Sequence, residues 1–156
     1  MFRIGKLTDY ALILMSCMAT RPAQQWRMEE LSDATRLPLP TVRKLMRELV
    51  SAHLVRSERG ARGGYQLSRL PDLISVAEII IAIEGPVAIT ECCDVEPDCD
   101  RLGACDMESR WPAINGLIQQ LLRVVTLSDI EYTREGRMDV AVLLSRLQNR
   151  SCPYPA

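Results

Sequence analysis

The sequence of 156 residues contains few of the side chains on which catalysis or base stacking depends. His53 is its only histidine, and we find no nucleophile–base pair, phosphate-binding loop or pair of catalytic carboxylates, so we do not expect an enzyme. Aromatic residues make up only 4% of the chain, which argues against a nucleic-acid site that stacks successive bases on aromatic rings.

Long apolar runs are also missing. No stretch approaches the roughly 20 apolar residues that a membrane span needs. An apolar run follows Ala11, but Asp9 interrupts the approach to it, and Thr8-Asp9 is typical of a helix start rather than of a secretion leader. Because no secretion signal accompanies the six cysteines, we expect a reducing compartment, the cytoplasm, and free thiols rather than disulfides.

Charge is plentiful but unevenly distributed. Residues 1–70 contain twelve Lys and Arg against six Asp and Glu, whereas residues 71–156 contain seven against fourteen. A basic region is the electrostatic footprint of phosphate binding, and an acidic region is repelled by DNA. The charge therefore indicates that the N-terminal half binds nucleic acid.

Apolar periodicity predicts a mainly helical chain with one small β-hairpin. We expect helices over residues 8–20, 29–36, 40–52, 75–84 and 112–125, a short helix over 140–147, and strands over 54–58 and 65–68. Pro40 suits the first turn of its helix, and Gly63 and Gly64 permit a tight hairpin. Helix, turn, helix and hairpin in this order predict a winged helix-turn-helix, followed by a long helix whose wide apolar face suits dimerisation.

This pattern divides the chain into three parts. We expect a winged helix-turn-helix DNA-binding domain over residues 1–72 and a cysteine loop with a dimerisation helix over 73–130. A C-terminal helix and tail follow over 131–156.

The second helix of a helix-turn-helix lies in the major groove of DNA, where its polar face meets base edges and phosphates. Arginine can bind guanine through two hydrogen bonds, and the residues at the tip of a wing suit the minor groove or the phosphate backbone. The predicted contacts with double-stranded promoter DNA are Thr41, Arg43, Lys44 and Arg47 on the helix, and Arg59 and Arg62 on the hairpin.

Three cysteines, Cys93, Cys99 and Cys105, follow one another at six-residue intervals in an acidic loop. Thiolates are ligands for both iron–sulfur clusters and zinc, and this spacing differs from the CxxC pairs of zinc ribbons. We therefore expect a cluster, 2Fe–2S or 4Fe–4S, with these three metal ligands. Four ligands are usual, and the candidates for the fourth are Glu108, Cys92, and Asp9 of the partner subunit. Cys17 lies in an apolar helix and is expected in the core, and Cys152 in the tail has no expected role.

Several segments of the chain resemble the winged-helix iron–sulfur regulators of the IscR/NsrR type. They are Leu7-Thr8-Asp9-Tyr10-Ala11, the helix over 40–54, the wing Arg59-Gly60-Ala61-Arg62-Gly63-Gly64-Tyr65-Gln66-Leu67 and the segment 74–80. The continuation over residues 82–92 is most similar to the SUF-operon regulator branch of proteobacteria. The resemblance covers roughly residues 1–130, and its specific parts are the wing and the cysteine triplet.

The resemblance implies a homodimer that binds a palindromic promoter site and holds one cluster per subunit on Cys93, Cys99 and Cys105. IscR-like members have a histidine three residues after the third cysteine, where this chain has Glu108. NsrR-like members use an aspartate in the first helix of the partner subunit, and Asp9 stands at the matching place. Asp9 is therefore the first candidate for the fourth ligand, Glu108 the second and Cys92 the third.

The sequence thus predicts a dimeric repressor that senses cluster status and controls SUF-type cluster assembly genes. Two other functions are consistent with the same residues. The first is a repressor whose cluster reacts with nitric oxide. The second is a cluster carrier or electron-transfer protein that has no use for DNA.

Overall fold

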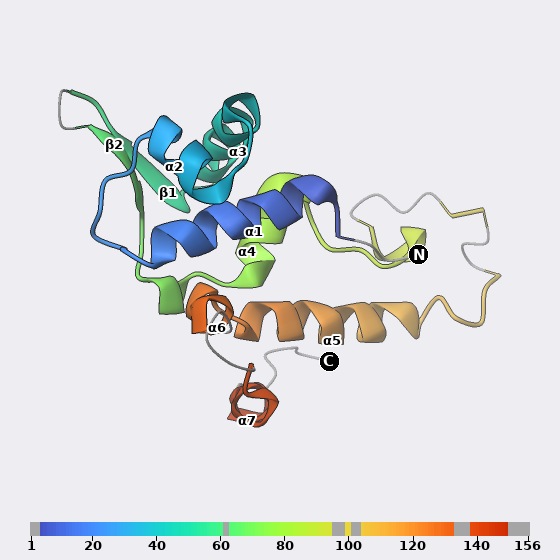
Figure 1. The fold of residues 1–156 in the computed structure, drawn as a ribbon. Helices are drawn as coiled ribbons and strands as arrows, with labels where there is room; N and C mark the ends of the chain where they lie inside the picture. The colour runs from blue at the N-terminus through green and yellow to red at the C-terminus, as the bar shows by residue number, and fades with distance from the viewer. Residues whose placement is uncertain (1–3, 61–62, 95–98, 101–103, 133–137, 150–156) are drawn as a thin grey trace.

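The structure is a computed structural model that describes residues 4–60, 63–94, 99–100, 104–132 and 138–149. It is mainly helical with one antiparallel two-stranded hairpin, which confirms the expected fold class (Figure 1). The α-helices are α1 (Lys6–Ala19), α2 (Met28–Thr35), α3 (Leu39–Ser51), α4 (Val76–Glu84), α5 (Trp111–Val124), α6 (Leu127–Tyr132) and α7 (Val140–Asn149). The strands are β1 (Val55–Glu58) and β2 (Gly64–Leu67), and the 3-10 turns are η1 (Pro71–Leu73) and η2 (Glu91–Cys93). None of the helices among these residues is long and apolar enough to cross a membrane.

Helix α1 lies at the centre of the fold, with α2, α3 and the hairpin on one side of it and α5 and α6 on the other (Figure 1). Because neighbours surround it, α1 is apolar at nearly every turn, and Leu14, Met15 and Met18 are fully buried. Leu45 and Leu49 of α3 belong to the same core. Burial of side chains of this size is the main stabilising contribution to the fold.

The hairpin pairs Val55 with Leu67 and Glu58 with Gly64, so its loop begins at Arg59. Trp26 extends it on the β2 side, because the backbones of Trp26 and Tyr65 exchange two hydrogen bonds of 2.8 Å. A Cβ on Gly64 would lie 2.8 Å from the carbonyl oxygen of Trp26, so a side chain at this position would push Trp26 away from β2. The wing is therefore fixed by the segment between α1 and α2 as well as by its own register.

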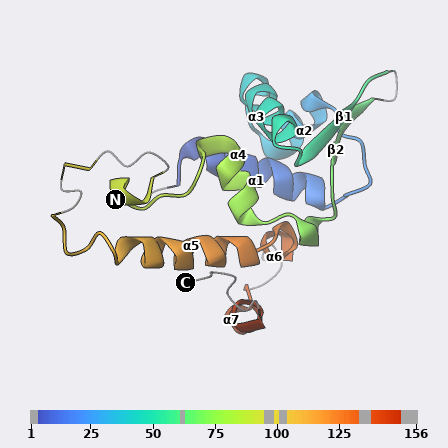
Figure 2. The ribbon, with the colours of Figure 1, turned by 180° about the vertical axis from the view of Figure 1, so that it is seen from behind.

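A second, smaller core joins α4 to α5 and α6. Val76, Ile80 and Val87 are its buried members, with partly buried side chains of α5 and α6 packed against them. The start of α4 is also tied by its backbone, since Val76 donates to the carbonyl of Val125 at 2.9 Å and Leu127 donates to that of Ile74 at 2.8 Å. Seen from behind, α5 and α7 again lie on the side of α1 and α4 away from the hairpin (Figure 2).

Most predicted elements are found within a residue or two of their expected bounds, but two expectations were incomplete. Helix α6 was not predicted, because its apolar anchor, the fully buried Leu127, gives no periodic signal over so short a helix. The start of the acidic loop also forms the 3-10 turn η2 over Glu91–Cys93, an element that was not predicted.

Candidate functional site

The turn between α2 and α3 is built from local contacts. Arg36 ends α2 in the left-handed conformation at φ 57°, and the Ser32 hydroxyl donates to the carbonyl of Leu37 at 2.7 Å. Pro38 then caps α3, and Pro40 lies in its first turn, where its missing N–H costs nothing, as the sequence predicted. This turn sets the angle at which α3 presents its outer face.

Helix α3 buries one face and exposes a basic one. Val42 and Leu49 are fully buried, whereas Arg43, Lys44 and Arg47 are exposed. No carboxylate among the described residues lies within ion-pair distance of these three cations, since the ion pairs found there join Arg69 to Glu78 and Arg146 to Asp129. Their positive charge is therefore available to an external anion.

The remaining predicted DNA contacts flank this face. Thr41 is half-buried at the start of α3, and Arg59 is exposed where β1 ends. Arg62 lies outside the described residues. A hollow of about 470 Å³ separates the start of α2 from the hairpin, with both Arg59 and Arg27 in its lining. The prediction from sequence did not include Arg27, which is exposed at the cap of α2 and would have been found only by knowing that α2 starts beside the wing.

The cysteine residues of the acidic loop are free thiols, and none is fully exposed. Cys93 lies in η2, and the Thr90 hydroxyl donates to its sulfur at 3.3 Å. The same hydroxyl lies 3.1 Å from the sulfur of Cys92. Cys99 and Cys105 are half-buried. Within the part of the chain that the structure describes, no three Cys, His, Asp or Glu side chains come close enough to hold a metal ion. The convergence of Cys93, Cys99 and Cys105 on one centre therefore stays a prediction.

The candidates for a fourth ligand lie on three separate elements. Asp9 is exposed in the first turn of α1, where its carboxylate also interacts favourably with the positive end of the helix dipole. Glu108 is half-buried just before α5, and its N–H donates to the carbonyl of Cys105 at 3.1 Å. Cys92 is half-buried in η2. The described residues do not bring any of the three together with the whole triplet.

The segment that leads into the cysteine loop is held by side chains that the prediction from sequence did not include. The amide of Asn115, buried in α5, accepts a hydrogen bond from the N–H of Ile89 and donates to the carbonyl of Val87, both at 3.2 Å. Gln119, one turn later, donates to the same carbonyl at 2.9 Å. Polar residues one turn apart within an apolar helix were the available signal. They fix residues 87–89 to α5, three residues before Cys92.

A second long-range tie joins the start of α1 to the end of α4. The backbone N–H of Gly5 donates to Glu84 Oε1 at 2.8 Å, and the hydroxyl of the buried Thr8 donates to the same oxygen. The carboxylate thus satisfies the backbone N–H of Gly5, the N-cap of α1, and lies at the positive end of the helix dipole. Thus α4 positions the end of α1 that carries Asp9.

Comparison with known proteins agrees with this arrangement. A model of the Rrf2 family, described as an iron-dependent transcriptional regulator, matches residues 4–132. The HTH-type transcriptional regulator CymR of Bacillus subtilis is 28% identical over 138 residues, which are 88% of this chain and 95% of that protein. A candidate HTH-type regulator of Azotobacter vinelandii, ORF2, is 31% identical over 128 residues, or 82% of this chain and 77% of that one.

Two solved structures share the fold. The structure of B. subtilis CymR, described as the global cysteine regulator, has a TM-score of 0.69 and 27% identity, covering 85% of this chain and 98% of that one. The T. potens IscR structure has a TM-score of 0.63 and 24% identity, covering 86% and 88%. Because the relatives are transcriptional regulators, the expectation that the chain is not an enzyme is confirmed. The chain belongs to the Rrf2 family of helix-turn-helix transcriptional regulators, which act on DNA.

Proposed function

We propose that this protein is a homodimeric repressor whose affinity for promoter DNA depends on an iron–sulfur cluster, and that it controls SUF-type cluster assembly genes. The observation that carries the proposal is the cysteine triplet between α4 and α5, in a family described as iron-dependent. The sequence similarity of residues 82–92 to SUF-operon regulators supports the choice of target genes.

DNA reading is assigned to α3 and the wing. The exposed and unpaired charges of Arg43, Lys44 and Arg47 support this role, and Thr41, at the start of α3, is placed to donate to a phosphate or a base. Arg59 and Arg62 would contact the minor groove or backbone beside it. Arg27 is added here as a phosphate contact, because it lines the same hollow as Arg59.

Dimerisation is assigned to α5. Leu117 is 67% exposed, and Ile114 and Leu121, one turn to either side, are 39% and 44% exposed. These side chains form one apolar face at helical spacing, which a second copy of the chain would cover. Two copies related by a two-fold axis would match the inverted repeat of a palindromic operator.

The donor set fits a cluster. Cys93, Cys99 and Cys105 are free and only partly buried, so that three soft thiolate ligands are accessible to iron. Asp9 of the partner subunit would be the fourth ligand, with Glu108 and Cys92 as alternatives. A bound cluster would supply a centre that oxidants or iron shortage can remove.

The residues around the loop suggest how such a loss would reach the DNA-reading surface. Asn115 and Gln119 fix residues 87–89 to α5, and α4 runs from there to the base of the wing. Release of the three thiols would change how α4 and α5 are held, and so the spacing of the two wings in the dimer. This is a shift between two populations, and it requires that the two forms differ in affinity for DNA.

The first test is the content of iron, acid-labile sulfide and zinc in full-length protein purified without oxygen. Iron with matching sulfide is expected, and zinc without sulfide would overturn the cluster assignment. The second test selects operators from a randomised duplex pool and compares cluster-loaded with chelator-treated protein at one salt concentration. An inverted repeat with unequal affinities is expected, and equal affinities would overturn the sensing role.

One relative favours a second function. CymR of B. subtilis is described as a cysteine regulator, at 27% identity over nearly its whole length. A regulator that responds to cysteine supply without a cluster would use the same α3 and wing. Such a protein would contain neither iron nor sulfide, and its DNA affinity would be unaffected by Cys99→Ser.

A repressor that senses nitric oxide is a third alternative. It would be favoured if the cluster-loaded protein lost DNA binding on exposure to nitric oxide but not on exposure to chelator.

A further inference from the structure

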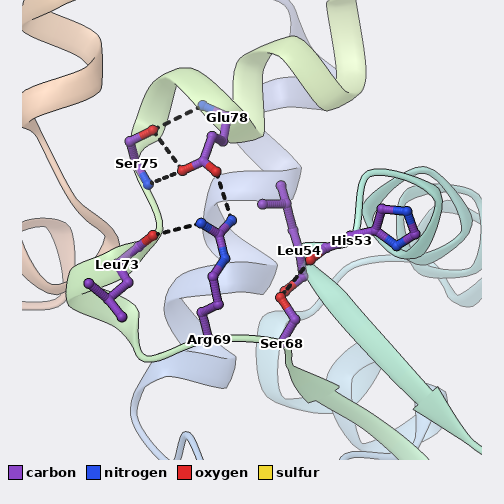
Figure 3. A network of polar contacts seen from close by, with 7 residues as sticks. All are labelled: His53, Leu54, Ser68, Arg69, Leu73, Ser75 and Glu78. Carbon is purple, nitrogen blue, oxygen red and sulfur yellow. Dashed lines mark hydrogen bonds and ion pairs between the residues drawn. The ribbon is translucent and has the colours of Figure 1, made fainter.

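The residue pair Ser68-Arg69 joins two parts of the molecule at the end of β2 (Figure 3). The Ser68 hydroxyl donates to the carbonyl of His53 at 2.6 Å and to that of Leu54 at 3.0 Å, and its backbone N–H donates to Leu54 at 3.0 Å. His53 and Leu54 follow Ala52, the C-cap of α3. Ser68 therefore anchors the end of the wing to the end of the helix that carries Arg43, Lys44 and Arg47.

Arg69 connects the end of β2 to the start of α4. Its guanidinium donates to the carbonyl of Leu73 at 3.0 Å and to Glu78 Oε1 at 2.7 Å (Figure 3). The other oxygen of Glu78 accepts from the N–H and the hydroxyl of Ser75, both at 2.9 Å, and the Ser75 hydroxyl accepts from the N–H of Glu78 at 3.3 Å. One carboxylate thus closes the N-terminal cap of α4 and at the same time holds Arg69.

The two anchors lie on adjacent residues, so the backbone between them is short. Consecutive Cα atoms are about 3.8 Å apart, so a single peptide unit separates the contact with the end of α3 from the contact with the start of α4. A rotation of α4 would therefore act on the end of β2 through the Arg69 side chain. The guanidinium binds the Leu73 carbonyl and Glu78 Oε1 through separate nitrogens, so its direction is held as well as its distance.

From this geometry we infer that Arg69 and Glu78 are positioning residues of the DNA-reading surface, which hold the wing at the angle to α3 that DNA binding requires. The inference rests on the proposed roles of α3 and the wing in DNA binding. Arg69 and Glu78 side chains are 40% and 38% exposed, and ion pairs this exposed add little to stability. Their contribution is therefore to orientation, and it is measured by DNA affinity rather than by folding alone.

The decisive variant is Glu78→Gln. It removes a negative charge and leaves Arg69 cationic and released, so a purely electrostatic effect, or a direct contact of Arg69 with phosphate, predicts equal or tighter DNA binding. A positioning role predicts the opposite sign, about three- to tenfold weaker binding to the selected operator, because a misdirected wing loses contacts. Arg69→Met, which keeps most of the side-chain length, should weaken binding to a similar extent.

Arg146→Met is the matched control. Arg146 forms the other ion pair of the described residues, with Asp129 at 2.8 Å, and is about as exposed as Arg69. It belongs to α7, which lies on the side of the molecule away from the wing (Figure 1). Arg146→Met should leave operator affinity unchanged. Equal or tighter binding by Glu78→Gln, or equal losses in all three variants, would overturn the inference.

Amide hydrogen exchange keeps the test independent of the DNA assay. Faster exchange of β2 amides in Arg69→Met and Glu78→Gln than in Arg146→Met is expected, with no change at the centre of α1. If the wild-type protein bound no duplex DNA, the proposed function would fail, but amide exchange would still show whether Arg69 and Glu78 hold the wing. Unchanged exchange of the β2 amides in both variants would overturn the positioning role.

Discussion

The N-terminal half, from α1 through the hairpin, and the C-terminal half, from η2 through α7, differ in where their side chains find partners. In the first, Leu14, Met18 and Leu49 are fully buried in one core. In the second, Leu117 of α5 and Val140 of α7 are 67% and 62% exposed, and the loop thiols are only partly covered. The apolar side chains of the first half find their partners within the chain, including Leu127 of α6, whereas the second half leaves apolar side chains and thiols exposed or only partly covered.

The strongest test of this contrast makes the same type of substitution, leucine to alanine, once in each half. Leu49→Ala removes a fully buried side chain and should lower the free energy of unfolding by about 2–5 kcal/mol. Leu117→Ala should change the stability of the folded monomer by no more than about 0.5 kcal/mol but weaken the dimer roughly tenfold. Denaturant unfolding and analytical ultracentrifugation measure the two quantities. A large loss of monomer stability in Leu117→Ala would show that α5 is covered within its own chain.

The cysteines allow a second comparison between the halves. Cys99→Ser should lower bound iron by about tenfold or more without unfolding the protein, since a hydroxyl is a poor substitute for a thiolate ligand. Cys17 of α1 lies in the hydrophobic core and is 8% exposed, so Cys17→Ser places a hydroxyl there. This should lower the free energy of unfolding by about 1–3 kcal/mol while iron is retained. Metal analysis and thermal unfolding of both variants give the answer, and equal iron loss in both would mean that the triplet is not the iron site.

Asn115 holds the segment that follows α4 against α5, and its removal should have a smaller effect. Asn115→Ala leaves the N–H of Ile89 without its partner and should lower stability by about 1–2 kcal/mol, with faster amide exchange at Ile89. Gln119→Ala is the matched control, because the carbonyl of Val87 keeps its bond from Asn115. If the two variants were indistinguishable, the anchoring of residues 87–89 would not depend on Asn115.

The smallest expected effect is that of pH on Glu78. Partial burial acts to raise its pKa, but hydrogen bonds from Ser75 and Arg69 outweigh it and hold the pKa below its ordinary value. A depressed pKa contributes stability above the pKa of the unfolded chain, and this is lost as the pH falls through the folded value. Glu78→Gln should therefore cost about 0.5 kcal/mol at pH 7, and the difference should shrink below about pH 4. If the stability difference between the wild type and Glu78→Gln grew as the pH fell, the pKa of Glu78 would not be lowered in the folded protein.

The sequence could predict features that depend on contacts between residues close together in the chain, but not those that depend on contacts between distant residues. Helical periodicity located α3 and the separation of its faces, because Val42, Leu45 and Arg43 obey a local pattern. The extension of the wing by Trp26, the capping of α1 by Glu84 and the amide contacts of Asn115 join residues 26 to 79 positions apart, and no local pattern reports them. The cysteine triplet was visible as a motif, but the path of residues 95–98 and 101–103 between its members lies outside the described residues.

The composition of α5 has a consequence for the choice of partner. From Trp111 to Leu122 the helix contains no charged residue, and Arg123 is the first. If α5 forms the proposed dimer contact, like-charge repulsion along this stretch cannot exclude the corresponding helix of a related regulator in the same cell. Discrimination between self and paralogue would then depend on the shapes of Ile114, Leu117 and Leu121, so exchange of these side chains between paralogues should produce mixed dimers.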